Sequence, residues 1–327
     1  KENIGKILVF GFAFYFVTIA LVLQFISVGA VIMADRYSYL PYIGLFFIVG
    51  YFFDYVRKSF SSFIAKLFAG VLIISAVIFS YLTHERTKVW TNAETLWTNV
   101  MNQFPFVEMS YENRGIFYKD NNQLDKMLAD YKFVTEKLHS KNEKIWSNLG
   151  NLYGLLKQFD KSLVAYSRAI ELNPDIANAY LNRAITYSMM GQYEKAIPDY
   201  DTALVLSPNE ALAYKNRAYT LLQLGKYQLS VNDYNKALEL NEYDTISVLN
   251  CGIAKFNAKL YSEALKDFQK YISMNQNNPQ AYFNASVAAK NMELYNEALQ
   301  YAEKAQSLGQ KIEPKYLEEI KTKKKSP

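Results

Sequence analysis

The sequence predicts an all-α protein in two parts: three transmembrane helices, then a solenoid of about six helix–turn–helix repeats that ends in a capping helix. Two features lead to this expectation. The first hundred residues hold three long apolar runs without charge, and the remainder repeats with a period of about 34 residues. A fixed period of that length is typical of helix pairs that stack on their neighbours to bury one continuous core.

Residues 1–83 form the predicted transmembrane region. The run Ile7–Ala34 has 28 residues without a charge, and a membrane-spanning helix needs roughly 20. Two more uncharged runs, Tyr37–Phe53 and Leu67–Thr83, follow closely, which a cleaved signal peptide would not show. We therefore expect helices at about 7–30, 37–56 and 62–83, and a juxtamembrane helical connector at 84–107.

The basic residues near these runs indicate which way the chain crosses the membrane. Five lie on the side of the N-terminus and three on the other side: Lys1, Lys6, Arg57, Lys58 and Lys66 against Arg36, Arg86 and Lys88. Cytoplasmic loops carry an excess of Lys and Arg. We expect an integral membrane protein of a bacterial inner membrane or an organelle membrane, with the repeats outside the cytoplasm.

Six asparagines, here called the asparagine comb, mark the repeat at spacings of 35, 34, 34, 34 and 34 residues: Asn113, Asn148, Asn182, Asn216, Asn250 and Asn284. Counting each as position 6 puts unit starts at 108, 143, 177, 211, 245 and 279, in an array at 108–311. Positions 4 and 24 are mostly aromatic, and positions 8 and 27 mostly small. Two packed antiparallel helices need this alternation. A capping helix with a basic tail is expected at 312–327.

The array resembles a tetratricopeptide repeat (TPR) domain from residue 108 to about 310. The residues on which this resemblance rests lie in the second unit: Trp146, Leu149, Gly150, Tyr153, Tyr166, Ala169 and Pro174. The resemblance implies a right-handed superhelical solenoid whose inner surface binds a protein or an extended peptide.

The asparagine comb suggests how such a partner would be held. An Asn side chain offers one acceptor and two donors, so it can pair with a peptide backbone whatever the side chains of the peptide. Apolar neighbours that include Ile185, Tyr219 and Ile253 would supply pockets. The comb resembles the asparagine ladder of O-GlcNAc transferase. The alternative is that Asn merely suits this helix position and stays solvated.

Two stretches beside the membrane carry a second resemblance: Ala34–Gly44, which reads ADRYSYLPYIG, and Arg86–Asn92, which reads RTKVWTN and precedes Leu96 and Trp97. With three spans leading into the repeats, the chain resembles the C-terminal part of C-type membrane glycosyltransferases with TPR tails. That group includes the transmembrane-and-TPR protein O-mannosyltransferases and bacterial relatives. The resemblance implies a polyprenyl-phosphate sugar donor and an extracytoplasmic active site.

Family enzymes of this kind carry their acidic catalytic residues in an early outer loop, and no residue here matches that loop. We therefore expect a fragment without its own catalytic residues. Asp35 and Arg36 are candidates for a lipid-phosphate contact, because Arg presents a planar fork of donors. An ion pair that ends a span is the alternative. A non-catalytic membrane-anchored scaffold for envelope proteins is the alternative for the whole chain.

Other chemistry finds no support in the residues. The two histidines and the single cysteine, Cys251, have no metal-ligand spacing, so neither a metal nor a cofactor is expected. A net charge of +5 from 36 basic and 31 acidic residues is mild, and the basic residues are scattered. Nucleic acid is therefore not an expected partner.

Overall fold

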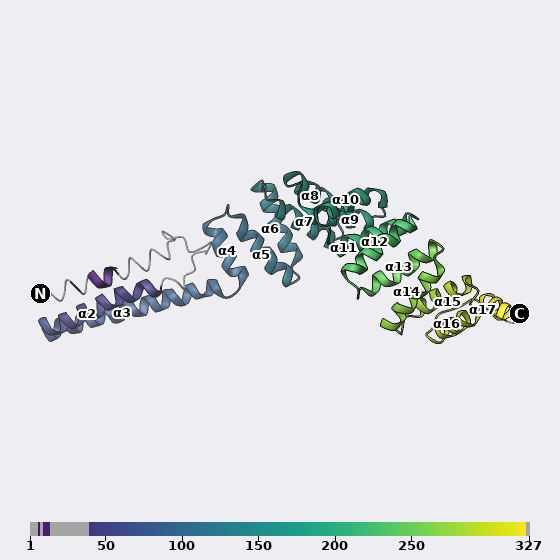
Figure 1. Ribbon diagram of the computed structural model, residues 1–327. Coiled ribbons are helices and arrows are strands. Elements are labelled where there is room, and N and C mark those ends of the chain that lie inside the picture. Colours follow the sequence, from purple (N-terminus) through teal and green to yellow (C-terminus); the bar gives the residue numbers. More distant parts are fainter. Residues whose placement is uncertain (1–5, 7–8, 14–38, 325–327) are drawn as a thin grey trace. The chain divides into compact units, whose positions relative to one another are not determined.

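The computed structural model describes residues 6, 9–13 and 39–324, with only the backbone of 39–42, 44, 45 and 324 (Figure 1). The chain forms two compact units, Lys1–Leu96 and Trp97–Pro327. Every regular element in the described ranges is a helix. The predicted all-α architecture is therefore confirmed for this part of the chain.

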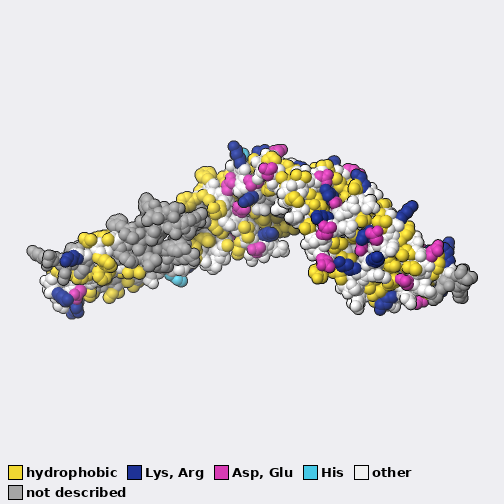
Figure 2. Space-filling model, viewed as in Figure 1, with side chains coloured by type: hydrophobic (Ala, Val, Ile, Leu, Met, Phe, Trp, Pro, Cys, Tyr) yellow, Lys and Arg dark blue, Asp and Glu magenta, His cyan; other side chains and the backbone are white. Residues whose placement is uncertain are grey.

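The first unit contains helix α2, Tyr39–Ser59, and helix α3, Ser62–Thr87, followed by the 3₁₀ turn η2, Lys88–Trp90. Aromatic rings join α2 to α3, with the Phe52 and Phe68 ring centroids 5.5 Å apart. On the face drawn in Figure 2, the described side chains of this unit are largely hydrophobic, whereas charged side chains are spread over the repeats.

Of the described helices, one, Ser62–Trp90, is long and apolar enough to cross a membrane, with a mean hydropathy of 2.3. None of its apolar stretch is buried inside the protein. This helix covers the third predicted span. Helix α2 covers most of the second, and the first, at about 7–30, lies largely outside the described residues. One candidate span is thus observed, and the other two stay predictions.

The second unit is a row of antiparallel helix pairs, seen one after another in Figure 1. Short helix α4 spans Ala93–Gln103 and precedes six pairs. The pairs are α5, Glu108–Asp120, with α6, Leu124–Lys132; α7, Glu143–Leu155, with α8, Phe159–Leu172; α9, Ala177–Met189, with α10, Tyr193–Leu206; α11, Ala211–Gln223, with α12, Tyr227–Leu240; α13, Thr245–Asn257, with α14, Tyr261–Met274; and α15, Pro279–Asn291, with α16, Tyr295–Ser307. A π-helical turn, η3, Phe133–Lys137, extends α6, and α17, Pro314–Lys324, closes the row.

In the first five pairs, an aromatic ring of the second helix packs against a small residue of the first, whereas the sixth pair has Ala302 at the aromatic position. A Cβ atom added to Gly150 would come within 2.6 Å of the Tyr166 ring, and one added to Gly252 within 2.7 Å of the Phe268 ring. Both rings are almost fully buried. The alternation of small position 8 and aromatic position 24 therefore lets the two helices approach closely, and a larger residue at position 8 would separate them.

The turn between the two helices of every pair contains one residue in the left-handed conformation, always at position 15. Glycine fills it in two units, as Gly191 and Gly225, with φ near +70°. The other four units use residues with a side chain: Asn122, Lys157, Lys259 and Glu293. A left-handed residue satisfies the carbonyl groups at a helix end, so the turn recurs even where the sequence has no glycine.

Helix α17 covers the exposed side of the last pair. Ile320 of α17 is fully buried in the core formed by α14, α15 and α16. The Tyr316 hydroxyl lies 2.9 Å from the Ser286 hydroxyl, and Lys290 forms a 2.6 Å ion pair with Glu319. Apolar surface that a seventh pair would bury is thus protected from water, as a solenoid end requires.

Candidate functional site

The asparagine comb lies on the first helices of the six pairs, α5, α7, α9, α11, α13 and α15. All six side chains are half-buried, so none is enclosed in the core and none stands fully in solvent. From α7 onward, each first helix contacts the first helix of the next pair. The comb therefore follows one layer of neighbouring helices.

Two comb amides take part in side-chain hydrogen bonds, one between units and one within its own helix. Asn182 donates to the Asn151 side-chain oxygen at 3.0 Å, and the Tyr166 hydroxyl donates to that same oxygen at 2.6 Å. Asn284 accepts from Gln280 at 2.9 Å. An Asn amide has one acceptor and two donors. Each of these contacts leaves part of the comb amide free for another partner.

The buried tyrosines at position 24 reach the comb from the second helices. Burial raises the pKa of Tyr131 to about 12, and Asn148 of the next unit, which bonds the phenol, opposes that rise. Burial likewise raises the pKa of Tyr166 to about 12. Asn250 lies beside the buried Tyr234 hydroxyl, which makes no hydrogen bond of normal distance and angle with the described residues. The comb thus forms the polar boundary between the core and the outer side of this helix layer.

The apolar residues predicted beside the comb remain accessible to different degrees. Tyr219 is exposed, while Ile185 and Ile253 are half-buried. All three occupy position 9, one helical turn after the comb residue of their own unit, and so share its face of the helix. We call this face, with the comb, the groove face. The proposal that it binds a peptide rests on this arrangement.

A pocket of about 340 Å³ opens on the groove face between the fifth and sixth units. Its lining comes from α13, α14 and α15: Ile253, Phe256, Asn257, Phe268, Gln280, Phe283, Asn284 and Val287. We call it the terminal pocket. It brings together Ile253 and Asn284, two of the residues that the sequence predicted for the site.

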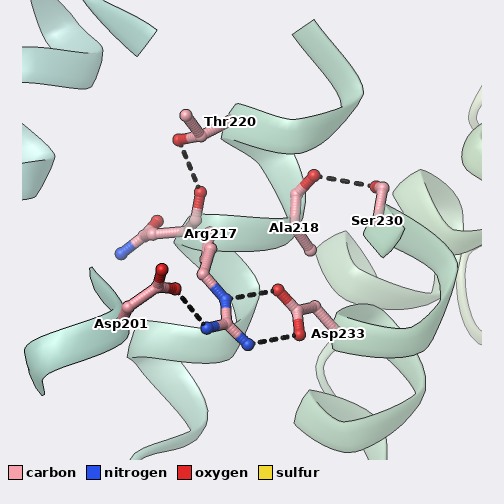
Figure 3. Close-up of polar contacts among 7 residues, drawn as sticks. Asp201, Arg217, Ala218, Thr220, Ser230 and Asp233 are labelled. Carbon is pink, nitrogen blue, oxygen red and sulfur yellow. Dashed lines mark hydrogen bonds and ion pairs between the residues drawn. The ribbon is translucent and has the colours of Figure 1, made fainter. Parts of the chain in front are cut away.

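Three of the six helices that carry the comb, α5, α9 and α11, are fixed by an arginine at position 7, next to the comb residue, and Figure 3 shows the one in α11. Arg217 of α11 donates from Nε and Nη2 to both carboxylate oxygens of Asp233 in α12, at 2.7 Å each. Its third nitrogen, Nη1, donates to Asp201 of the preceding pair at 2.6 Å. Such a two-pronged pair has a defined geometry, so Arg217 sets both the pairing of α11 with α12 and the stacking on α10.

The same bridge recurs in two other units. Arg183 donates to both carboxylate oxygens of Asp199 and also to the Ser167 hydroxyl of the preceding pair. Arg114 binds Asp130 in the same way and donates to Thr98 of α4. Sequence reasoning missed these bridges, although Arg at position 7 is always accompanied by Asp 16 residues later. That pairing was the signal that could have revealed them.

The other three units have no arginine at position 7, which is Leu149 in the second, Cys251 in the fifth and Ala285 in the sixth. The Cys251 thiol is buried and donates to Asn235 at 3.5 Å, and burial raises its pKa to about 12. The carboxylate left at position 23, Asp267, forms a 2.8 Å ion pair with Lys255 instead. A thiol this far from ionisation is a poor nucleophile, so Cys251 is a packing residue.

The remaining site predictions are not addressed by the described residues. Asp35 and Arg36, predicted for a lipid-phosphate contact, lie outside them. Within the described ranges, no group of three or more His, Cys, Asp or Glu side chains could hold a metal ion. The site is therefore built from amides and apolar groups rather than from ionisable ones.

Comparisons with known proteins identify the repeats. Family models of the tetratricopeptide repeat match residues 143–176, 177–210, 211–244 and 279–310. No curated protein matches the chain at a significant level. These four units are tetratricopeptide repeats, as the sequence predicted.

Solved structures with a similar fold are numerous. YrrB, described as a TPR protein with an unusual peptide-binding site, is 23% identical over 59% of this chain and 97% of its own, with a TM-score of 0.53. MamA is 22% identical over 54% and 97%, with a TM-score of 0.47. A tetratricopeptide repeat protein from Parabacteroides merdae is 20% identical over 76% and 97%, with a TM-score of 0.49. At such identities the likeness to YrrB shows the fold alone.

Proposed function

We propose that this tetratricopeptide-repeat chain is a membrane-anchored module that holds an extended segment of another protein on its groove face. The terminal pocket carries the proposal, because it joins apolar side chains to three amides, Asn257, Gln280 and Asn284, on the face that bears the comb. Binding sites for extended peptides combine such features. Backbone pairing supplies orientation, and pockets supply selectivity.

Anchoring is supported by the composition of α3. Its exposed side chains include Phe63, Leu67, Ile73, Val77 and Phe79, all more than half accessible. Contiguous apolar surface of this kind marks a site that water does not normally cover. The helix Ser62–Trp90 has 29 residues, enough for a hydrocarbon layer that about 20 residues cross.

The comb is tested by removing amides while keeping the helices. Replacing Asn182, Asn216 and Asn250 together by Ala should weaken binding of unstructured peptides at least tenfold, since each lost backbone hydrogen bond contributes about 0.5–1.5 kcal/mol. The measurement is fluorescence anisotropy with labelled peptides and the full chain in lipid nanodiscs.

Asn232→Ala with Asn296→Ala is the matched control, because these exposed asparagines lie on second helices, α12 and α16. The control should bind like the wild type. Unchanged affinity in the comb variant, with helicity preserved, would refute backbone recognition by the comb.

A more specific form of the proposal follows from the two membrane-proximal stretches. The likeness of Ala34–Gly44 and Arg86–Asn92 to TPR-bearing C-type glycosyltransferases favours a role in presenting acceptor protein to a polyprenyl-phosphate-sugar-dependent enzyme. A non-catalytic scaffold for envelope proteins remains the alternative, and no feature of the described residues favours it.

The proposed role in presenting acceptor protein is tested by finding on which side of the membrane the repeats lie. The excess of Lys and Arg on the N-terminal side favours repeats outside the cytoplasm. Protease added to right-side-out vesicles or spheroplasts should then digest the array and leave the membrane helices. A protected array in sealed right-side-out vesicles, digested only after the membrane is opened, would contradict presentation to an extracytoplasmic enzyme.

A further inference from the structure

The terminal pocket differs from the equivalent space between the other units. Its floor is Phe268, whereas the same position 24 is tyrosine in the four preceding units. In two of those units the hydroxyl is tied to the first helix of its own pair: Tyr166 donates to Asn151 at 2.6 Å, and Tyr200 lies 3.2 Å from Ser188. In the fifth unit the corresponding residues are Ile253 and Phe256, and the floor carries no hydroxyl.

The walls of the pocket are apolar for a similar reason. Phe283, at position 5 of the sixth unit, stands where the fourth unit has Lys215, which forms a 2.8 Å ion pair with Asp244. Phe283 is supported from behind by Tyr316 of the capping helix, with ring centroids 5.5 Å apart. The ring is therefore held in place by α17 and presents a firm apolar wall.

Three charged residues close in sequence to the lining are already paired. Lys255, next to Phe256, binds Asp267, next to Phe268, at 2.8 Å, and Lys290 binds Glu319 at 2.6 Å. No charged side chain lines the pocket. A charged guest would lose its hydration without gaining a partner, so the lining complements an uncharged apolar group.

We infer that the terminal pocket receives one bulky uncharged apolar side chain of the extended segment, an inference that rests on the proposed function. A volume of about 340 Å³ is near the lower end for ligand sites, which range over roughly 300–1,000 Å³. It suits a single large side chain. Gln280 and Asn284 at its rim are placed to bond the backbone on either side of that residue.

The test uses host–guest peptides: an unstructured, uncharged host of Ser, Thr, Gly and Asn with one central guest, Trp, Leu, Ala, Lys or Glu. With the full chain in nanodiscs, Trp and Leu guests should bind at least about tenfold tighter than Ala, because buried apolar groups discriminate by about 10–200-fold. Lys and Glu guests should bind no better than Ala.

Variants of the pocket use residues that this chain already places at the same positions. Phe268→Tyr introduces the hydroxyl found in four other units, and Val287→Asn introduces the residue found at Asn151. Both should remove most of the preference for Trp and Leu over Ala. Leu222→Ser, at the position of Phe256 but one unit earlier, is the control that should keep the preference.

The outcomes separate the two proposals. A guest preference that disappears in both pocket variants supports the inference. Peptides that bind equally well whatever the guest, or a preference that survives both variants, would overturn the pocket assignment while the groove stands. Absence of binding for every guest would overturn both.

Discussion

At the scale of single residues, the tyrosines at position 24 connect the core to the comb. Tyr131 and Tyr166 are almost fully buried, yet their hydroxyls meet Asn148 and Asn151 at the edge of the groove face. The ring fills the space over a glycine, and the hydroxyl keeps an amide in place. Core packing and site geometry therefore depend on the same side chains.

These tyrosines predict a loss of stability in alkali. Burial raises the pKa of both Tyr131 and Tyr166 to about 12, above the ordinary value near 10. The folded state then holds the phenol proton more tightly than the unfolded state. The stabilisation is complete below pH about 10 and is lost as the pH rises toward 12, by roughly 2–3 kcal/mol for each residue.

Circular dichroism and phenolate absorbance, followed together from pH 9 to 12, measure this effect. The array should unfold as the last tyrosines ionise. In the double variant Tyr131→Phe and Tyr166→Phe, the transition should move to higher pH, because phenylalanine is already used at this position in Phe268. Complete ionisation near pH 10 with the helices intact would contradict the account.

At the scale of elements, each helix pair closes through the left-handed residue at position 15. Glycine adopts this conformation without cost, whereas a residue with a Cβ atom is disfavoured by about 1–2 kcal/mol. Glycine also carries more conformational entropy in the unfolded chain, which offsets roughly 0.4–1 kcal/mol of that gain. The net balance favours glycine.

Lys259→Gly is therefore expected to stabilise the array. Lys259 is exposed and has φ +62°, so the change removes strain without removing a core contact. We expect a gain of about 0.5–1 kcal/mol, seen as a higher urea midpoint. The reverse change, Gly225→Lys, should lower the midpoint by a similar amount. A lower midpoint for Lys259→Gly, or an unchanged or higher one for Gly225→Lys, would refute the explanation.

The helices could be predicted from the sequence more completely than the contacts between helix pairs. The all-α repeats followed from the 34-residue period and the small and aromatic positions, because those patterns lie within one unit. The bonds of Arg217 to Asp201 and of Asn182 to Asn151 join different units. Their existence depends on how one pair is rotated against the next, and no pattern within one unit specifies that rotation.

At the scale of the whole molecule, one candidate membrane helix and a set of tetratricopeptide repeats belong to the same chain. The membrane helix confines the repeats to the bilayer surface if it inserts as proposed, which raises the effective concentration of the repeats near other membrane proteins. Weak binding of an extended segment would then suffice for function. The terminal pocket would add selectivity to a comb that by itself recognises only backbone.

The most direct test of the central claim is a double-mutant cycle between the comb and the peptide backbone. N-methylation of alternate amides in a bound peptide removes the backbone N–H groups that would donate hydrogen bonds to the comb oxygens. The double variant Asn182→Ala with Asn216→Ala removes those oxygens from the protein. We predict that N-methylation weakens binding to the wild type by about tenfold and changes binding to the variant by less than about twofold. An equal loss in both proteins would contradict recognition of the backbone by the asparagine comb.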